Sequence, residues 1–229
     1  MERLLDEHLE KLKTRVIKMC SLVDEQVQLA CKAIEEDNLE LAKYVIEQDK
    51  KVDKFDLKID KICQKIFALT QPVAMDLRLI MSSMTLNTDL ERIGDIAVNI
   101  AENLLLIQKK PDFYYQTKLP EMFEKTKLML KNAIDAYINA NPELAKTVIF
   151  DDKEVDKINS ENHSILKGIM KQSPNNIEGG VALLVISREL ERIADHSTNI
   201  AEDVFFIYEA QMIKHKYEKF FFEDTSDED

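Results

Sequence analysis

The chain has 229 residues, with only 4 glycines and 5 prolines, and a formal net charge of −12 at pH 7. Such a composition is typical of long helices and disfavours sheets joined by tight turns. The negative charge excludes nucleic acid as a partner, because a phosphate-binding surface needs a dense face of Lys and Arg.

The first residues, MERLLDEHLEKLK, are charged from the second position and contain no apolar segment of the signal-peptide kind. No stretch approaches the roughly 18 apolar residues of a membrane span. Cys20, Cys31 and Cys63 show no CxxC spacing, which favours buried, reduced thiols. We therefore expect a cytoplasmic protein.

Apolar residues recur at steps of three and four from Leu5 to Ile34, which predicts one long amphipathic helix. Asp37-Asn38 interrupts this pattern and can cap a second helix, which stops before Pro72. Pro72 is expected to be an early position of a third helix, which Pro111 ends.

The second half repeats this plan. A fourth helix is expected over residues 119–140, Asn141-Pro142-Glu143 is a start signal for a fifth, and Ser173-Pro174 opens a sixth. The fold class is therefore all-α, with two tandem antiparallel three-helix bundles of elongated shape. We assign residues 1–110 to the first bundle, 111–118 to a linker, 119–217 to the second bundle and 218–229 to an acidic tail.

One phrase occurs twice, as LERIGDIAVNIAE at 90–102 and LERIADHSTNIAE at 190–202, with nine of its thirteen positions identical. Each copy places Glu, Asp, Asn and Glu on one helix face, at Glu91, Asp95, Asn99 and Glu102 and at Glu191, Asp195, Asn199 and Glu202. We call each set of four residues a ladder. The helix face that carries it lies roughly opposite the apolar stripe, so we expect each ladder to lie outside the bundle core.

The second and fifth predicted helices carry a similar stripe, at Asp49, Asp53, Asp56 and Asp60 and at Asp152, Asp156, Asn159 and His163. Stacked carboxylates repel one another, and a multivalent cation compensates this repulsion with hard oxygen ligands. A cation site in each half is therefore predicted. The alternative is a merely solvated face that Arg92 and Arg192 neutralise.

The two phrases resemble the duplicated E(D)xxxD signature of the PhoU family of phosphate-transport regulatory proteins. VIEQDKKVDKFDLKID at 45–60, DLRLIMSSM at 76–84 and FDDKEVDKIN at 150–159 support the resemblance, which extends over about residues 5–215. It implies two similar three-helix bundles, in agreement with the helix count.

The resemblance also implies a function. PhoU proteins are cytoplasmic regulators that associate with the ATPase subunit of a phosphate ABC transporter and with a membrane sensor histidine kinase, and they hold down the phosphate-starvation response. The protein is then peripheral to the membrane through these partners only, and we expect a homodimer because elongated bundles commonly pair.

The family binds metal through its E(D)xxxD residues, which implies a ligand set on this chain. The ligands implied are Glu91, Asp95, Glu191 and Asp195, with Asp49, Asp53, Asp152 and Asp156 from the adjoining helices and Asn99 and Asn199 from the ladders. The ion is divalent or ferric, with iron, zinc, manganese, magnesium and calcium left open. Because Asn159 and His163 replace Asp56 and Asp60, the two sites are expected to differ in affinity or nuclearity.

Three classes of function are compatible with a long helical chain of this kind. A non-catalytic, metal-binding adaptor is favoured, since the chain has no Gly-rich phosphate loop and no nucleophile with a matching base. A ferritin-like di-metal carboxylate oxidase or storage protein requires Glu-x-x-His motifs, and the sequence has none. A purely structural helical spacer does not account for the doubled ladder.

Overall fold

The computed structural model describes residues 2–211, which form six long helices and no strand within that range. The helices are α1 (Glu2–Glu36), α2 (Leu39–Leu69), α3 (Ala74–Ile107), α4 (Leu119–Ile138), α5 (Pro142–Gln172) and α6 (Ile177–Glu209), with short 3₁₀ turns η1 (Tyr114–Gln116) and η2 (Pro174–Asn176). The predicted all-α fold of two three-helix bundles is confirmed. The predicted end of the second bundle at 217 and the acidic tail 218–229 lie outside the described residues.

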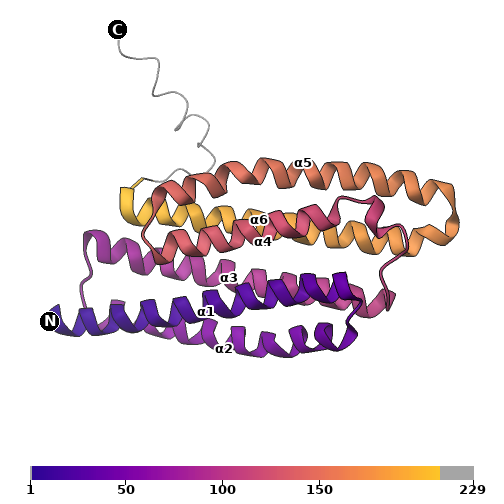
Figure 1. The fold of residues 1–229 in the computed structure, drawn as a ribbon. Helices are drawn as coiled ribbons and strands as arrows, with labels where there is room; N and C mark the ends of the chain where they lie inside the picture. Colours follow the sequence, from indigo (N-terminus) through magenta and orange to yellow (C-terminus); the bar gives the residue numbers. More distant parts are fainter. Residues whose placement is uncertain (1, 212–229) are drawn as a thin grey trace, which may run out of the picture.

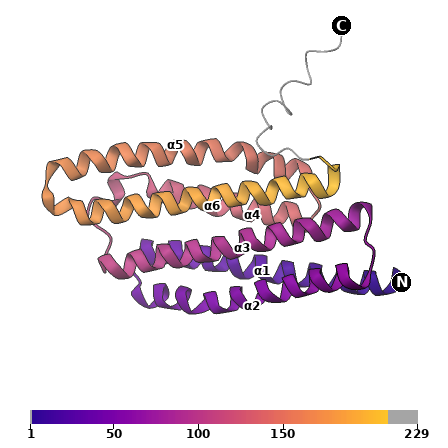
Figure 2. The same cartoon turned by 180° about the vertical axis from the view of Figure 1, so that it is seen from behind.

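The two bundles lie side by side and form an elongated molecule (Figure 1). Helix α2 is outermost on one side and α5 on the other, with α1, α3, α4 and α6 between them, as the view from behind also shows (Figure 2). Helices α3 and α6, which carry the duplicated phrase, pack against each other and run in opposite directions. This pairing decides which side of each ladder meets solvent.

Both bundles use the same turn between their first two helices. Asp37 adopts a left-handed conformation (φ 52°), and the Asn38 side chain then caps α2 by accepting a hydrogen bond from the Leu41 backbone N–H at 3.0 Å. In the second bundle Asn141 caps α5 by accepting from the Leu144 N–H at 3.1 Å. The cap satisfies a backbone donor that the first helical turn leaves free, which explains why both predicted starts are correct.

Helix boundaries near prolines differ from the prediction. Pro72 precedes α3, which begins at Ala74 after an extended Val73. Ser173 is also extended, and the proline after it opens η2 instead of α6. Proline disfavours the helical conformation in the residue before it, so Ser173 leaves the helix ahead of Pro174 and α6 begins only at Ile177.

The predicted apolar stripes form the core. Leu86, Leu90, Ile93 and Ile100 of α3 are fully buried, and they join a hydrophobic cluster that is continuous through both bundles. The cysteines at 20, 31 and 63 are free and buried, as predicted. Among the described residues, no helix is long and apolar enough to cross a membrane.

Candidate metal centres

Helices α2 and α3 bring six carboxylates into one group, which we call the N-terminal acidic cluster: Asp49, Asp53, Asp56, Asp60, Glu91 and Asp95. Partial burial raises the pKa of Glu91, and repulsion by Asp95 and by the α2 carboxylates raises it further. The pKa values of Asp49 and Asp56 are raised for the same two reasons. Four of the five residues predicted as ligands in this half, namely Glu91, Asp95, Asp49 and Asp53, therefore lie together, whereas Asn99 lies outside the cluster.

Two buried amides reach into this cluster. Gln26 Nε2 of α1 donates to Asp49 Oδ1 at 3.1 Å, and Asn87 Nδ2 of α3 donates to Asp56 Oδ1 at 2.6 Å and to Asp60 Oδ1 at 3.2 Å. The amide oxygens, Gln26 Oε1 and Asn87 Oδ1, are buried without a hydrogen-bond partner. An orphaned acceptor of this kind is costly, and a water molecule or an ion would satisfy it.

Sequence reasoning missed both amides, although each left a signal. Asn87 lies four residues before Glu91 and thus extends the ladder by one turn. Gln26 is a polar residue beside the apolar positions Val23 and Val27, where a buried side chain is expected.

Helices α5 and α6 form the matching C-terminal acidic cluster, which consists of Asp152, Asp156, Glu191 and Asp195. Burial and then repulsion by the other three carboxylates raise the pKa of Asp152 to about 7, and a contact with the Thr198 hydroxyl opposes this only in part. The Oδ1 atom of Asp152 is buried without a hydrogen-bond partner. A cation would relieve both the repulsion and this unpaired oxygen.

Arginine does not pair with either cluster. Within residues 2–211, no ion pair joins a Lys or Arg to any cluster carboxylate. The Arg192 guanidinium instead donates to both oxygens of Glu189, at 3.0 and 2.9 Å. Arg188 and, to a smaller extent, Arg192 lower the pKa of Glu191 only through space, and Arg92 lines a separate cavity.

The residues present fit a hard cation in chemistry, since their donors are carboxylate oxygens without paired positive charge. In the described part of the chain no three His, Cys, Asp or Glu side chains stand close enough to hold an ion as they are. A cation would therefore have to draw neighbouring carboxylates toward itself.

The ladder does not run straight along its helix. Each step of four residues turns the side chain by about 40°, because an α-helix has 3.6 residues per turn. Asn87 is thus fully buried against α2, Glu91 is half-buried, Asp95 is exposed and Asn99 has turned toward α6. The C-terminal copy also has an exposed Asp195 and a half-buried Glu191.

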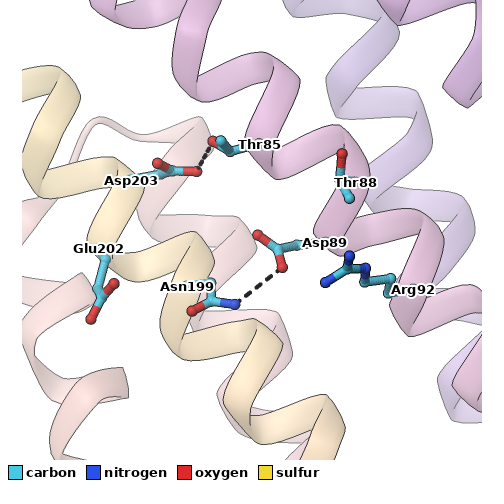
Figure 3. A pocket seen from close by; sticks show the side chains of 7 residues that line it. All are labelled: Thr85, Thr88, Asp89, Arg92, Asn199, Glu202 and Asp203. Carbon is cyan, nitrogen blue, oxygen red and sulfur yellow. Dashed lines mark hydrogen bonds between the residues drawn. The ribbon is translucent and has the colours of Figure 1, made fainter. Parts of the chain in front are cut away.

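Consequently Asn99 and Asn199 lie at the interface between the bundles. Asn99 Nδ2 donates to Glu189 Oε2 at 3.4 Å, and Asn199 Nδ2 donates to Asp89 Oδ1 at 3.1 Å. Their role as metal ligands stays a prediction, but the contacts that the structure gives them are with these interface carboxylates. Glu202 corrects the expected position of the ladder, because it is only 8% exposed although its carboxylate points away from α3 (Figure 3).

This interface borders an open cavity of about 290 Å³. Figure 3 shows its lining of α3 and α6 side chains: Thr85, Thr88, Asp89, Arg92, Asn199, Glu202 and Asp203. The Thr85 hydroxyl donates to Asp203 across the cavity. The inter-bundle contact beside the clusters is therefore polar.

The PhoU domain model matches two segments of the sequence, residues 16–104 and 119–204, one in each bundle. The chain belongs to the PhoU family. It is 36% identical over 215 residues to the "Phosphate-specific transport system accessory protein PhoU homolog" of Aquifex aeolicus, covering 94% of this chain and 97% of that protein. It is 33% identical to the PhoU protein of Serratia marcescens, over 90% of this chain and 85% of the relative.

Solved PhoU structures have the same fold. The crystal structure of PhoU from Pseudomonas aeruginosa superposes with a TM-score of 0.86 at 32% identity, covering 90% of this chain and 99% of that one. The phosphate transport system regulatory protein PhoU from Streptococcus pneumoniae gives a TM-score of 0.80 at 26% identity, with 91% and 98% covered.

Proposed function

We propose that this PhoU-family protein is an accessory regulator of phosphate uptake and of phosphate-starvation signalling. In this role it acts as a metal-binding adaptor between the ATPase subunit of a phosphate ABC transporter and a sensor histidine kinase, whose response it holds down. The names of the relatives support the transport role, since they are phosphate-specific transport system accessory proteins.

The observation that carries the metal-binding part is the pair of acidic clusters. Each gathers carboxylates from two neighbouring helices without a paired Lys or Arg, and in one of them a carboxylate oxygen is buried without a partner. Uncompensated charge of this kind raises the free energy of the folded chain. A fold that keeps it in both halves gains stability when a cation binds.

Glu91, Asp95, Asp49 and Asp53 would hold an ion in the first bundle, and Glu191, Asp195, Asp152 and Asp156 would hold one in the second. The ion supplies positive charge and no chemical step. It would link α2 to α3 and α5 to α6, so that each pair of helices presents a fixed face to a partner. Basic partner surfaces fit the acidic side chains that remain exposed.

The alternative of a ferritin-like oxidase or storage protein gains no support. Its ligands project into the interior of a four-helix core, whereas Asp95 and Asp195 are exposed on the outside of three-helix bundles. The hypothesis of a passive helical spacer does not explain why both halves gather carboxylates without a paired Lys or Arg.

The metal part is tested by Glu91→Ala combined with Asp95→Ala. We expect a lower content of bound Mn²⁺, measured by elemental analysis after dialysis, with the helical circular dichroism signal retained. Glu102→Ala is the matched control, because Glu102 is exposed on the same helix and lies outside the cluster. Equal metal content in the double variant and the wild type would contradict the ligand assignment.

The adaptor part is tested by a pull-down with the purified ATPase subunit of the phosphate transporter. We expect retention of the metal-loaded protein and weaker retention after treatment with a chelator. The chelator removes the ions, and the metal-free clusters then lose their fixed geometry. The absence of retention in both states would overturn the adaptor role while leaving metal binding intact.

A further inference from the structure

The outermost helix of the first bundle carries a row of exposed lysines. Helix α2 forms one edge of the molecule in both views (Figures 1 and 2). At 100° per residue the lysines fall within an arc of about 80°, on the side of α2 opposite its buried apolar residues. The row consists of Lys50, Lys54, Lys58, Lys61 and Lys65. None of them forms an ion pair with an acidic side chain of residues 2–211.

Helix α1 widens this row. Lys11, Arg15 and Lys18 follow one another at steps of four and three and therefore share a face of α1. The Arg15 guanidinium lies 6.0 Å from the centre of the Phe55 ring of α2, and Lys58 Nζ lies 5.5 Å from the same centre. These contacts place the α1 row beside the α2 row. We call the three residues of α1 and the five lysines of α2 the basic surface.

The described part of the second bundle has no counterpart of this surface. At the positions that correspond to the last three lysines of the row, α5 has Glu161, Ser164 and Gly168. Glu161 forms an ion pair with Lys118 of α4. The basic surface is therefore not a consequence of the repeat, and it lies at one edge of a chain whose net charge is −12. Composition does not reveal it, because the net charge averages over the whole chain.

We propose that the basic surface binds the anionic headgroups of a lipid membrane. Lys54 and Lys58, like Lys61 and Lys65, are like-charge pairs at i and i+4, which destabilise a helix unless an anion compensates them. The α2 row is about 22 Å long at 1.5 Å per residue, and with the α1 row beside it the surface can meet an extended layer of negative charge. Leu57 lies next to the row and is 57% exposed, so it can enter the boundary between headgroups and acyl chains.

The residue types favour lipid phosphate over the carboxylates of an acidic protein. Seven of the eight side chains of the basic surface are Lys, and Arg15 is the exception. The Arg guanidinium forms a rigid fork that matches carboxylates, whereas the Lys ammonium is a point charge on a flexible stem, which suits mobile headgroups. At physiological ionic strength, charges more than about 8 Å away are largely screened, so acidic residues elsewhere on the chain do not cancel this attraction.

Such a contact would be direct, in addition to contact through the protein partners of the proposed function. It would turn α2 toward the membrane and α5 away from it, because these two helices form opposite edges of the molecule (Figure 1). The N-terminal acidic cluster would then lie between the membrane and the second bundle.

The test is co-sedimentation of the purified protein with vesicles, in EDTA so that the result does not depend on bound metal. We expect binding to phosphatidylcholine vesicles that contain about 30% phosphatidylglycerol, and none to vesicles of phosphatidylcholine alone. Binding should decrease as NaCl is raised from about 0.1 M to about 0.5 M. A wild-type protein that does not bind the anionic vesicles would overturn the inference and leave the metal-binding adaptor untouched.

Lys54→Gln, Lys61→Gln and Lys65→Gln together should weaken vesicle binding by at least about tenfold, because each Lys near an anionic surface contributes to binding. The matched control removes the same charge from exposed positions of α5, with Lys157→Gln, Lys167→Gln and Lys171→Gln, and should leave vesicle binding unchanged. Circular dichroism checks that both variants are folded. Equal weakening in the two variants would overturn the inference, as would binding to polyglutamate or duplex DNA but not to the vesicles.

Discussion

His196 Nδ1 of α6 lies 2.8 Å from Asp89 Oδ1 of α3, and both side chains are only 12% exposed. The same carboxylate oxygen accepts a hydrogen bond from Asn199, while Glu189 of α6 accepts one from Asn99 of α3. Because α3 and α6 are antiparallel copies of one phrase, these contacts are reciprocal. Polar pairs therefore join the two bundles directly beside the acidic clusters.

His196→Ala should lower the free energy of unfolding by about 1–2 kcal/mol, because the buried Asp89 loses one of its two partners across the interface. Urea denaturation monitored by circular dichroism measures the change. His163→Ala is the control, since His163 is exposed on α5, and it should change the value by less than about 0.5 kcal/mol. Equal effects of the two variants would show that the pair does not stabilise the interface.

The metal-free protein should lose stability as the pH rises from about 4 to about 7. The pKa of Asp152 is about 7 in the folded chain and 3.8 without its surroundings, so only the folded state keeps the proton between these values. Stability contributed by this proton is present at low pH and is lost as the pH rises through 7. Thermal unfolding in EDTA at several pH values measures the trend.

Asp152→Asn should flatten this pH dependence, because the amide has no proton to lose and does not repel Asp156. Saturating Mn²⁺ should flatten it as well if the cluster binds the ion, since a cation favours the ionised carboxylate. A steep dependence that persists in the Asn variant would assign the titration to another group.

Gly94→Val should destabilise the protein by about 1–3 kcal/mol, through overpacking between α1, α2 and α3. A Cβ atom at this position would lie 3.2 Å from Asp49 Oδ1, 3.3 Å from Gln26 Oε1 and 3.3 Å from Val52 Cγ1. The Asp49 carboxylate has to move to make room, so Mn²⁺ binding should weaken as well. Thermal unfolding and Mn²⁺ titration are the measurements.

Gly168→Ala is the matched glycine control. An added Cβ atom there meets nothing within 4 Å, and the position is exposed inside α5. The change should raise the free energy of unfolding by about 0.5–1 kcal/mol through helix propensity. The two glycine variants are thus expected to change stability in opposite directions, and a loss of stability in both would contradict this packing argument.

Asn162→Ala should cost about 2–3 kcal/mol, because this fully buried side chain joins three parts of the second bundle. Its Oδ1 accepts from the Lys118 backbone N–H at 2.8 Å, and its Nδ2 donates to Ser187 Oγ at 3.2 Å. Removal of the amide leaves the partly buried N–H of Lys118 without this acceptor. Urea denaturation, with the exposed Ser164→Ala as control, distinguishes this loss from a general effect of substitutions on α5.

Much of the fold followed from local patterns. The apolar steps of three and four located all six helices, and Asn38 and Asn141 fixed two of their starts. The predicted helix starts were wrong near two prolines, because a proline can stand either in the first turn of a helix or just before it. Pro72 and Pro174 could have stood in the first turn of a helix, but the extended residues beside them placed both outside α3 and α6.

By itself, the sequence determined the duplicated helices and the carboxylates at Glu91, Asp95, Glu191 and Asp195, because helical periodicity and side-chain charge are local properties. Only the tertiary structure decided that Asn99 and Asn199 face the inter-bundle contact, that Glu202 is buried, and that Gln26 and Asn87 enter the N-terminal acidic cluster. The physical reason is that a helix pattern defines faces but not their neighbours. The packing of α3 on α6 and of α1 on α2, between residues far apart in the chain, determines which polar groups are buried together.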